Sequence, residues 1–154
     1  MSDVWYANDL KPGSQISLSS YTVTETEIID YARRWDPLFI HTDPVAAADS
    51  PLGGVVASGL HTLAIYQHLA VRALWQHFDG GIGSGFEIRF RRAVHPDTTL
   101  TGRLTIQSVT ARPERHDAKV TVRGELVDED DNTVLELTNY SVLPLAPARL
   151  VTSD

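Results

Sequence analysis

The feature that most constrains the fold is a change of pattern at Gly80-Gly81. Before this pair the sequence is mostly helical in character, and after it every periodic segment alternates as strands do. The longest helical segment begins at Ser58 or Gly59 and runs to about Phe78, with no glycine or proline beyond Gly59. Because a helix and a sheet each bury one apolar face, we expect this helix to pack on a sheet formed by the second half.

Strands are expected throughout the second half of the chain. They cover residues 86–91, 100–109, 119–127 and 133–143, and a further strand is expected at 15–23. The connections between the later strands are short and favour an antiparallel meander. One long helix lying on such a sheet defines the α+β class.

A second helix is expected directly after Thr24. The Thr24 side chain can cap the first turn, and Glu27 can reach back to the backbone to complete a capping box. This helix is expected to end at Asp36-Pro37, because the residue before a proline is pushed out of the helical region. Residues 36–57 are then expected to be irregular, except for a turn of helix at 44–48.

Composition excludes several classes of function. The 154 residues suit one domain, and the excess of 20 acidic over 13 basic residues argues against a nucleic-acid partner. The chain has no cysteine, which excludes disulfides and thiol chemistry. Neither a signal peptide nor a membrane-spanning segment is recognisable, so we expect a cytoplasmic protein that has no membrane partner.

The strongest candidates for chemistry are Asp36 and His41, five residues apart in a segment fixed by Pro37. A carboxylate and an imidazole that converge on one water can orient it and exchange its proton. The alternative is that Asp36 caps a turn and His41 is an ordinary loop residue. A metal site formed by Asp36, His41 and Asp43 is a second alternative, but such a pattern is common by chance and we expect no metal.

The second candidate is Ser58-Gly59, at the start of the long helix. Unpaired N–H groups at a helix N-terminus suit a developing oxyanion, and Gly59 allows a carbonyl to approach closely. The simpler alternative is that Ser58 is only an N-cap. Three histidines of this helix are expected to be surface or satisfied interface residues: His61, His68 and His77. His61 is set apart because it lies one turn from the candidate oxyanion site.

In order and spacing, these motifs resemble the hotdog-fold acyl-thioester hydratases and dehydratases of the MaoC-like type, which include the (R)-specific enoyl-CoA hydratases. Asp36 and His41 keep that family's spacing, and Thr42-Asp43-Pro44 continues its motif. Ser58-Gly59 opens the helix as in the family, and residues 91–100 resemble its strand-exit segment. The resemblance makes residues 1–154 a single MaoC-like hotdog domain with a core at about 15–143.

The resemblance implies a hotdog fold, in which an antiparallel sheet wraps around a long central helix. It also implies a hydro-lyase of fatty acid metabolism that adds or removes water across the α,β double bond of an acyl thioester of CoA or acyl carrier protein. Asp36 and His41 would be catalytic, and Ser58 and Gly59 would bind the substrate, with the Gly59 N–H on the thioester carbonyl. No cofactor or metal is implied, and a homodimer or a dimer of dimers would place its sites at the subunit interface.

The sequence departs from the family at Leu38 and Phe39, which stand where the family has Asn and Pro. Two other functions therefore stay open. A thioesterase would want a carboxylate on the long helix, and residues 58–78 contain none. A non-catalytic subunit that binds acyl ligands is disfavoured because both Asp36 and His41 are retained.

Three arginines form either a solvated strand face or a rim site for a phosphorylated carrier: Arg89, Arg91 and Arg92.

Overall fold

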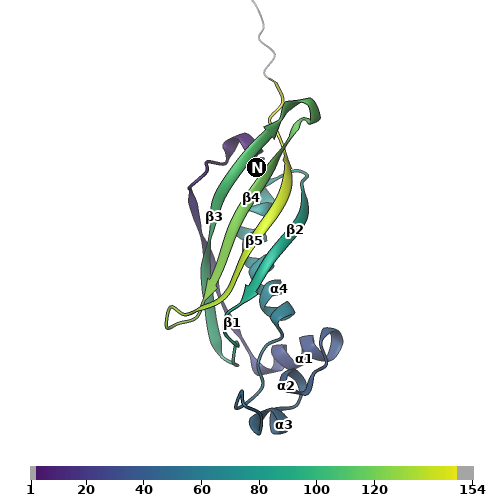
Figure 1. Ribbon diagram of the computed structural model, residues 1–154, viewed down its shortest axis with the longest axis vertical. Coiled ribbons are helices and arrows are strands. Elements are labelled where there is room, and N and C mark those ends of the chain that lie inside the picture. Colours follow the sequence, from purple (N-terminus) through teal and green to yellow (C-terminus); the bar gives the residue numbers. More distant parts are fainter. Residues whose placement is uncertain (1–2, 149–154) are drawn as a thin grey trace, which may run out of the picture.

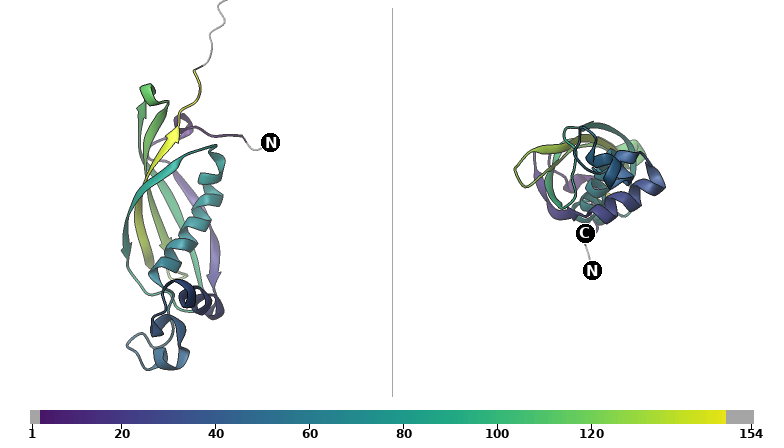
Figure 2. Two further views of the ribbon diagram at one scale, coloured as in Figure 1. Left: turned by 90° about the vertical axis from the view of Figure 1, so that its right-hand side faces the viewer. Right: turned by 90° about the horizontal axis from the view of Figure 1, so that it is seen from below.

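A five-stranded antiparallel sheet curves around helix α4 (Gly59–Ala73) in the computed structural model, which describes residues 3–148 (Figures 1 and 2). The strands are β1 (Gln15–Val23), β2 (Ile82–Phe90), β3 (Thr98–Arg112), β4 (Asp117–Val127) and β5 (Thr133–Pro144). Short 3₁₀ turns occupy Ala7–Asp9, Trp75–His77 and Pro113–Arg115. The predicted α+β hotdog arrangement is therefore confirmed.

The sheet departs from the expected meander at both of its ends. Strands β3, β4 and β5 pair in sequence order, but β2 pairs with β5 and β1 pairs with β3, which gives the order β1-β3-β4-β5-β2. Alternation in the sequence identified the strands but not their partners, because every strand offers an apolar face that suits several neighbours. Strands β1 and β2 are consequently the two edges of the sheet.

The central strands form the core by strict alternation. The buried side chains of β4 are Ala118, Val120, Val122 and Leu126. They share one core cluster with Tyr66 and Leu69 of α4. A Cβ on Gly124 would overlap the Tyr66 ring, so glycine at this position lets the helix approach the sheet closely.

Helix α4 is shorter than expected and buries a different face. It ends at Ala73, because Leu74 leaves the helical region at φ −137° and ψ −61° and is fully buried. Leu60 of the expected apolar stripe is 52% exposed, whereas His61 is only 3% exposed. Of the two places expected for His61, the surface is excluded, and the residue lies in the interface with α1, 3.4 Å from Glu27. Helix α1 covers the side of α4 that carries His61. Because α4 packs against both α1 and the sheet, its buried residues do not follow a single apolar stripe.

The three other helices lie together at one end of the sheet (Figures 1 and 2). They are α1 (Glu25–Trp35), α2 (Phe39–Thr42) and α3 (Pro44–Ala48). Thr24 caps α1 as predicted, because its Oγ1 accepts the Glu27 N–H at 3.2 Å. The Glu27 carboxylate does not complete the capping box. It accepts the Tyr21 hydroxyl and lies 3.4 Å from His61 Nε2, so tertiary partners replace the local one.

The segment between α1 and α4 is more regular than predicted. His41 lies in the single helical turn of α2, and the predicted turn of helix at 44–48 is α3. The other two histidines of the α4 region differ as well: His68 is exposed as expected, whereas His77 is half-buried and stacks on Trp5. No helix within residues 3–148 is long and apolar enough to cross a bilayer.

Candidate active site

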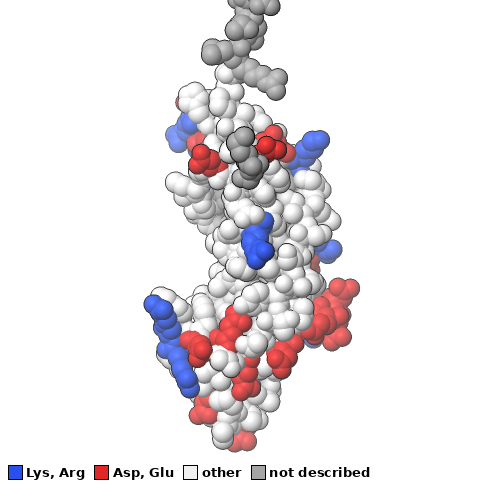
Figure 3. All heavy atoms as spheres, turned by 180° about the vertical axis from the view of Figure 1, so that it is seen from behind, with Lys and Arg blue, Asp and Glu red and all other residues white. Residues whose placement is uncertain are grey.

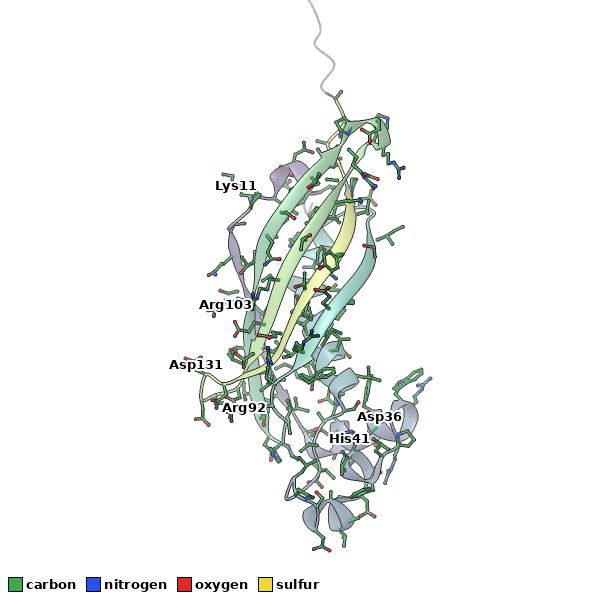
Figure 4. The ribbon with its side chains drawn as sticks, viewed as in Figure 1. Lys11, Asp36, His41, Arg92, Arg103 and Asp131 are labelled. Carbon is green, nitrogen blue, oxygen red and sulfur yellow. The ribbon has the colours of Figure 1, made fainter. Side chains whose placement is uncertain are left out.

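Asp36 and His41 come together where α1, α2 and α4 meet, at the lower end of the molecule in Figure 4. Asp36 ends α1, and its backbone N–H donates to the Ala32 carbonyl at 2.9 Å. The Asp36 Oδ2 atom lies 3.6 Å from His41 Nε2. The His41 side chain is 8% exposed and that of Asp36 is 28% exposed. The carboxylate is therefore the member of the pair that solvent reaches more easily.

Three hydrogen bonds join the segment that carries this pair to the segment that leads into α4. The Val56 N–H donates to the Ile40 carbonyl at 3.0 Å. His41 Nδ1 lies 2.6 Å from the Val56 carbonyl oxygen. The Ser58 hydroxyl donates to Asp36 Oδ2 at 2.7 Å. The geometry of the pair thus depends on both segments.

The hydrogen bond at His41 Nδ1 determines which ring nitrogen carries the hydrogen. A backbone carbonyl only accepts, so His41 Nδ1 must donate to Val56. In the neutral ring this leaves the lone pair on Nε2, the nitrogen that faces Asp36 Oδ2. Two acceptors then point toward each other at a distance too long for a direct hydrogen bond. One water can satisfy both by donating a hydrogen to each.

The N-terminus of α4 lies directly beside the pair. Ser58 is fully buried, and its Oγ accepts the Leu60 N–H at 3.2 Å while donating to Asp36. The Thr62 N–H bonds to the Ser58 carbonyl. Within residues 3–148, no acceptor pairs with the Gly59 N–H. This donor, at the positive end of the helix dipole, is available to a carbonyl oxygen.

Gly59 and the exit of β2 form a small hollow of about 270 Å³, which Arg91 and Arg92 also line. The Phe90 ring packs so closely over Gly59 that a Cβ on the glycine would lie 2.8 Å from Phe90 Cζ. Only glycine therefore fits beneath this ring without displacing it.

A larger cavity of about 670 Å³ runs along α4, between this helix and strands β2 and β5. Its aromatic lining comes from Tyr31, Trp35, Trp75, Phe78 and Phe86. The sequence predicts that Asp36 and His41 line one pocket with the Gly59 N–H. Within residues 3–148, neither of the two lines this cavity or the hollow at Gly59, and the two spaces share no lining residue.

The alternative of a metal site is not supported by the geometry. Asp43 Oδ1 accepts the Val45 and Ala46 N–H groups at 3.0 and 3.1 Å, which makes Asp43 the cap of α3. Across residues 3–148, no three His, Asp or Glu side chains gather in a way that could hold a metal ion.

Sequence reasoning missed a second polar cluster beside the first. His61 Nε2 lies 3.4 Å from Glu27 Oε1, and its ring stacks on Tyr31 at 4.5 Å. His61 Nδ1 is buried and has no hydrogen-bond partner among residues 3–148. Burial lowers the pKa of His61, and the Glu27 carboxylate opposes this shift. The available signal was the spacing of Glu27 and Tyr31, which places both on one face of α1.

Comparison with known proteins gives one family and several similar structures. A family model described as "MaoC like domain" matches residues 8–128. Protein MaoC of Klebsiella aerogenes is 29% identical over 111 residues, which are 71% of this chain and 33% of that protein. The chain therefore spans about a third of the length of that relative.

Two solved structures show how far the likeness extends. The MaoC-like dehydratase from Rhodospirillum rubrum has a TM-score of 0.84 and 29% identity, over 93% of this chain and 99% of that one. The unliganded R-hydratase PhaJ1 from Pseudomonas aeruginosa has a TM-score of 0.76 and 17% identity, over 97% of this chain and 95% of that one. The second likeness concerns the fold alone.

Proposed function

The chain belongs to the MaoC-like domain family, and we propose that it adds water to, or removes it from, the α,β double bond of an acyl thioester. The observation that carries this proposal is the geometry of Asp36 and His41. A lone pair on His41 Nε2 and a carboxylate oxygen of Asp36 face one another at 3.6 Å. The MaoC-like dehydratase from Rhodospirillum rubrum, at 29% identity, supports this class of reaction. A cytoplasmic location, as the sequence predicts, is part of the proposal.

In the hydration direction, Asp36 and His41 hold the water and accept its proton. The water oxygen forms a bond to the β-carbon as the double bond breaks, and the pair returns a proton to the α-carbon. The sum of these steps is the addition of one water molecule. The electron pair that moves toward the thioester carbonyl in between is stabilised by the Gly59 N–H at the α4 N-terminus. Ser58 holds Asp36 in place through its hydroxyl at 2.7 Å.

The surroundings of Gly59 favour a substrate carried on a phosphorylated arm. Arg91 forms an ion pair with Glu136, whereas Arg92 forms none within residues 3–148. CoA and acyl carrier protein both present their acyl group on a phosphopantetheine arm. We propose that this arm passes over the hollow at Gly59, with Arg92 near its phosphate. The apolar cavity along α4 would then receive the acyl chain.

We also propose a homodimer, or a dimer of dimers, in which a second copy covers the β2 edge. Four large apolar residues are exposed at β2 and at the adjacent start of α4: Leu60 at 52%, Ile82 at 73%, Phe86 at 42% and Phe90 at 52%. Seen from behind, the middle of the molecule is mostly uncharged, while carboxylates gather toward the lower end (Figure 3). Unpaired edge strands and apolar patches of this kind favour association. A stable monomer at micromolar concentration in sedimentation would contradict this assembly.

The proposed activity is tested with a panel of enoyl and 3-hydroxyacyl thioesters of CoA, by following the absorbance of the conjugated double bond. We expect the absorbance to change with enoyl and 3-hydroxyacyl substrates in opposite directions. Thiol release, measured in parallel with a thiol reagent, detects the competing thioesterase reaction. The protein has no cysteine, so it adds no background to this second assay. Thiol release without a change in the double bond would overturn the proposal in favour of hydrolysis.

A further inference from the structure

Helices α1 and α4 meet through three successive contacts. Glu27 Oε1 lies 3.4 Å from His61 Nε2, and the Tyr31 ring stacks on the His61 imidazole at 4.5 Å with an interplanar angle of 9°. The third contact is the hydrogen bond from Ser58 to Asp36 at 2.7 Å. From the first contact to the third, the residue number rises on the α1 side from 27 to 36 and falls on the α4 side from 61 to 58. The two helices therefore run antiparallel here. The third contact is the one that holds the candidate catalytic carboxylate.

We propose that His61 is a positioning residue, which clamps α1 onto α4 and thereby sets the place of Asp36 relative to Ser58 and Gly59. This inference rests on the proposed function for its effect on rate. The clamp itself is a property of the two helices and is measurable without a substrate. His61 need not touch the substrate in this role.

Packing alone does not explain a histidine at this position. Glu27 accepts a hydrogen from Nε2, so the lone pair of the neutral ring lies on Nδ1. That atom is buried, and residues 3–148 offer it no hydrogen-bond partner. Leaving a buried polar atom unpaired is unfavourable, and an apolar side chain would avoid it. The imidazole provides two features that an apolar chain cannot combine. It has a flat face for Tyr31 and an N–H for Glu27.

The groups around His61 extend the clamp in both directions. On one side, the Tyr21 hydroxyl of β1 donates to Glu27, and the His68 ring packs edge-on against Tyr21. On the other side, Tyr31 lines the large cavity. Burial raises the pKa of Tyr31, and the negative charge of Asp36 raises it further, which places this phenol within the field of the candidate catalytic carboxylate. The clamp thus connects β1, through α4, with the end of α1.

The test compares three variants by steady-state kinetics and by hydrogen exchange of the α1 amides. His61→Phe keeps a ring that can stack on Tyr31 but removes the bond to Glu27. Glu27→Gln is the conservative variant, because its amide oxygen can still accept from both neighbours. Ile65→Val is the matched control, since Ile65 is 4% exposed on the same helix and removing one methyl group disturbs packing without touching the clamp.

We expect His61→Phe to lower kcat by about 10- to 100-fold with little change in KM, the size of loss that follows misplacement of a catalytic group by about 1 Å. The α1 amides should exchange faster in this variant than in the wild type. Glu27→Gln should keep most of the wild-type rate, and Ile65→Val should retain wild-type kcat. Should His61→Phe fail to fold, Glu27→Ala addresses the same clamp from the other helix.

Two outcomes would overturn the inference. One is wild-type kcat in His61→Phe together with faster exchange in α1, and the other is an equal loss of kcat in Ile65→Val. A wild-type protein that converts no thioester would instead contradict the proposed function. In that case hydrogen exchange alone tests whether His61 holds α1 against α4, and unchanged exchange in His61→Phe would refute this role.

Discussion

The two buried histidines of this protein face carboxylates at almost the same distance, yet their chemistry differs. The separation is 3.6 Å for His41 and Asp36, and 3.4 Å for His61 and Glu27. The Val56 carbonyl holds the hydrogen of His41 on Nδ1, so a lone pair faces the carboxylate. His61 Nδ1 has no such partner in the described part of the chain, and Nε2 donates to Glu27. Only the first pair presents two acceptors to a water.

The two carboxylates also differ in the groups that donate hydrogen bonds to them. Asp36 accepts from Ser58, at the N-terminus of α4, where the helix dipole can act on a substrate. The Gly59 N–H at this end has no acceptor among residues 3–148. Glu27 lies in the first turn of α1 and accepts from the Tyr21 phenol. Distance between an acid and a histidine therefore does not identify a catalytic pair. The partner of the second ring nitrogen and the group behind the carboxylate are what separate the two.

The largest expected difference comes from making the same change in each carboxylate. Asp36→Asn should lower kcat by about 10²–10⁴-fold, the usual range for a positioned acid or base, and His41→Ala should do the same. The double variant should be little worse than either single one, because groups that act as a unit are not additive. Glu27→Gln should stay far more active than Asp36→Asn. Equal losses in steady-state kinetics would remove the distinction between the pairs.

A smaller loss is expected at the helix end that only the first pair adjoins. Gly59→Ala should lower kcat/KM by about 10²-fold. The added Cβ would displace the Phe90 ring and hinder the approach of the substrate carbonyl. Gly59→Ala combined with Phe90→Leu relieves this clash and should recover part of the activity. A variant pair with no recovery would assign the loss to the backbone of Gly59 itself.

The hydroxyl donors behind the two carboxylates give a third comparison. Ser58→Ala should lower kcat about tenfold and lower the free energy of unfolding by about 1 kcal/mol, because it removes the bond to Asp36 and a helix cap together. Tyr21→Phe removes the donor to Glu27 and should leave kcat nearly unchanged. Chemical denaturation beside kinetics separates the two effects. A Tyr21→Phe variant as slow as Ser58→Ala would contradict the comparison.

The smallest expected effect is a dependence of stability on pH that belongs to His61. Its pKa is lowered by burial from the ordinary value of about 6.5, although Glu27 opposes the shift. Between the lowered and the ordinary pKa, the unfolded chain binds a proton that the folded chain does not. Stability should therefore be complete above about pH 7 and fall as the pH decreases.

His61→Phe should reduce this loss of stability on acidification, as measured by thermal melting at several pH values. His68→Gln provides the control, because His68 is an exposed histidine of the same helix. The same acid slope in wild type and His61→Phe would show that other groups cause it. The groups that face His61 and enter the interpretation are Glu27 and Tyr31 of α1, and Tyr21 of β1 through Glu27.

Local patterns in the sequence determined a large part of this fold. Alternation placed the strands, Thr24 and Ser58 marked where two helices begin, and Pro37 marked the end of α1. The spacing of Asp36 and His41 was enough to bring them together, since a short segment bent by a proline has few conformations. Such signals work because period, capping and proline geometry act over a few neighbouring residues.

Only the tertiary structure decided which elements meet. The pairing of β2 with β5, the burial of His61 and the turn of Glu27 away from its cap each depend on partners that are distant in sequence. The tautomer of His41 depends on the hydrogen bond from its Nδ1 to the Val56 carbonyl, which lies in a different segment. Periodicity shows whether a side chain faces an apolar or a polar environment. The free energies of competing long-range contacts decide which residue it contacts there.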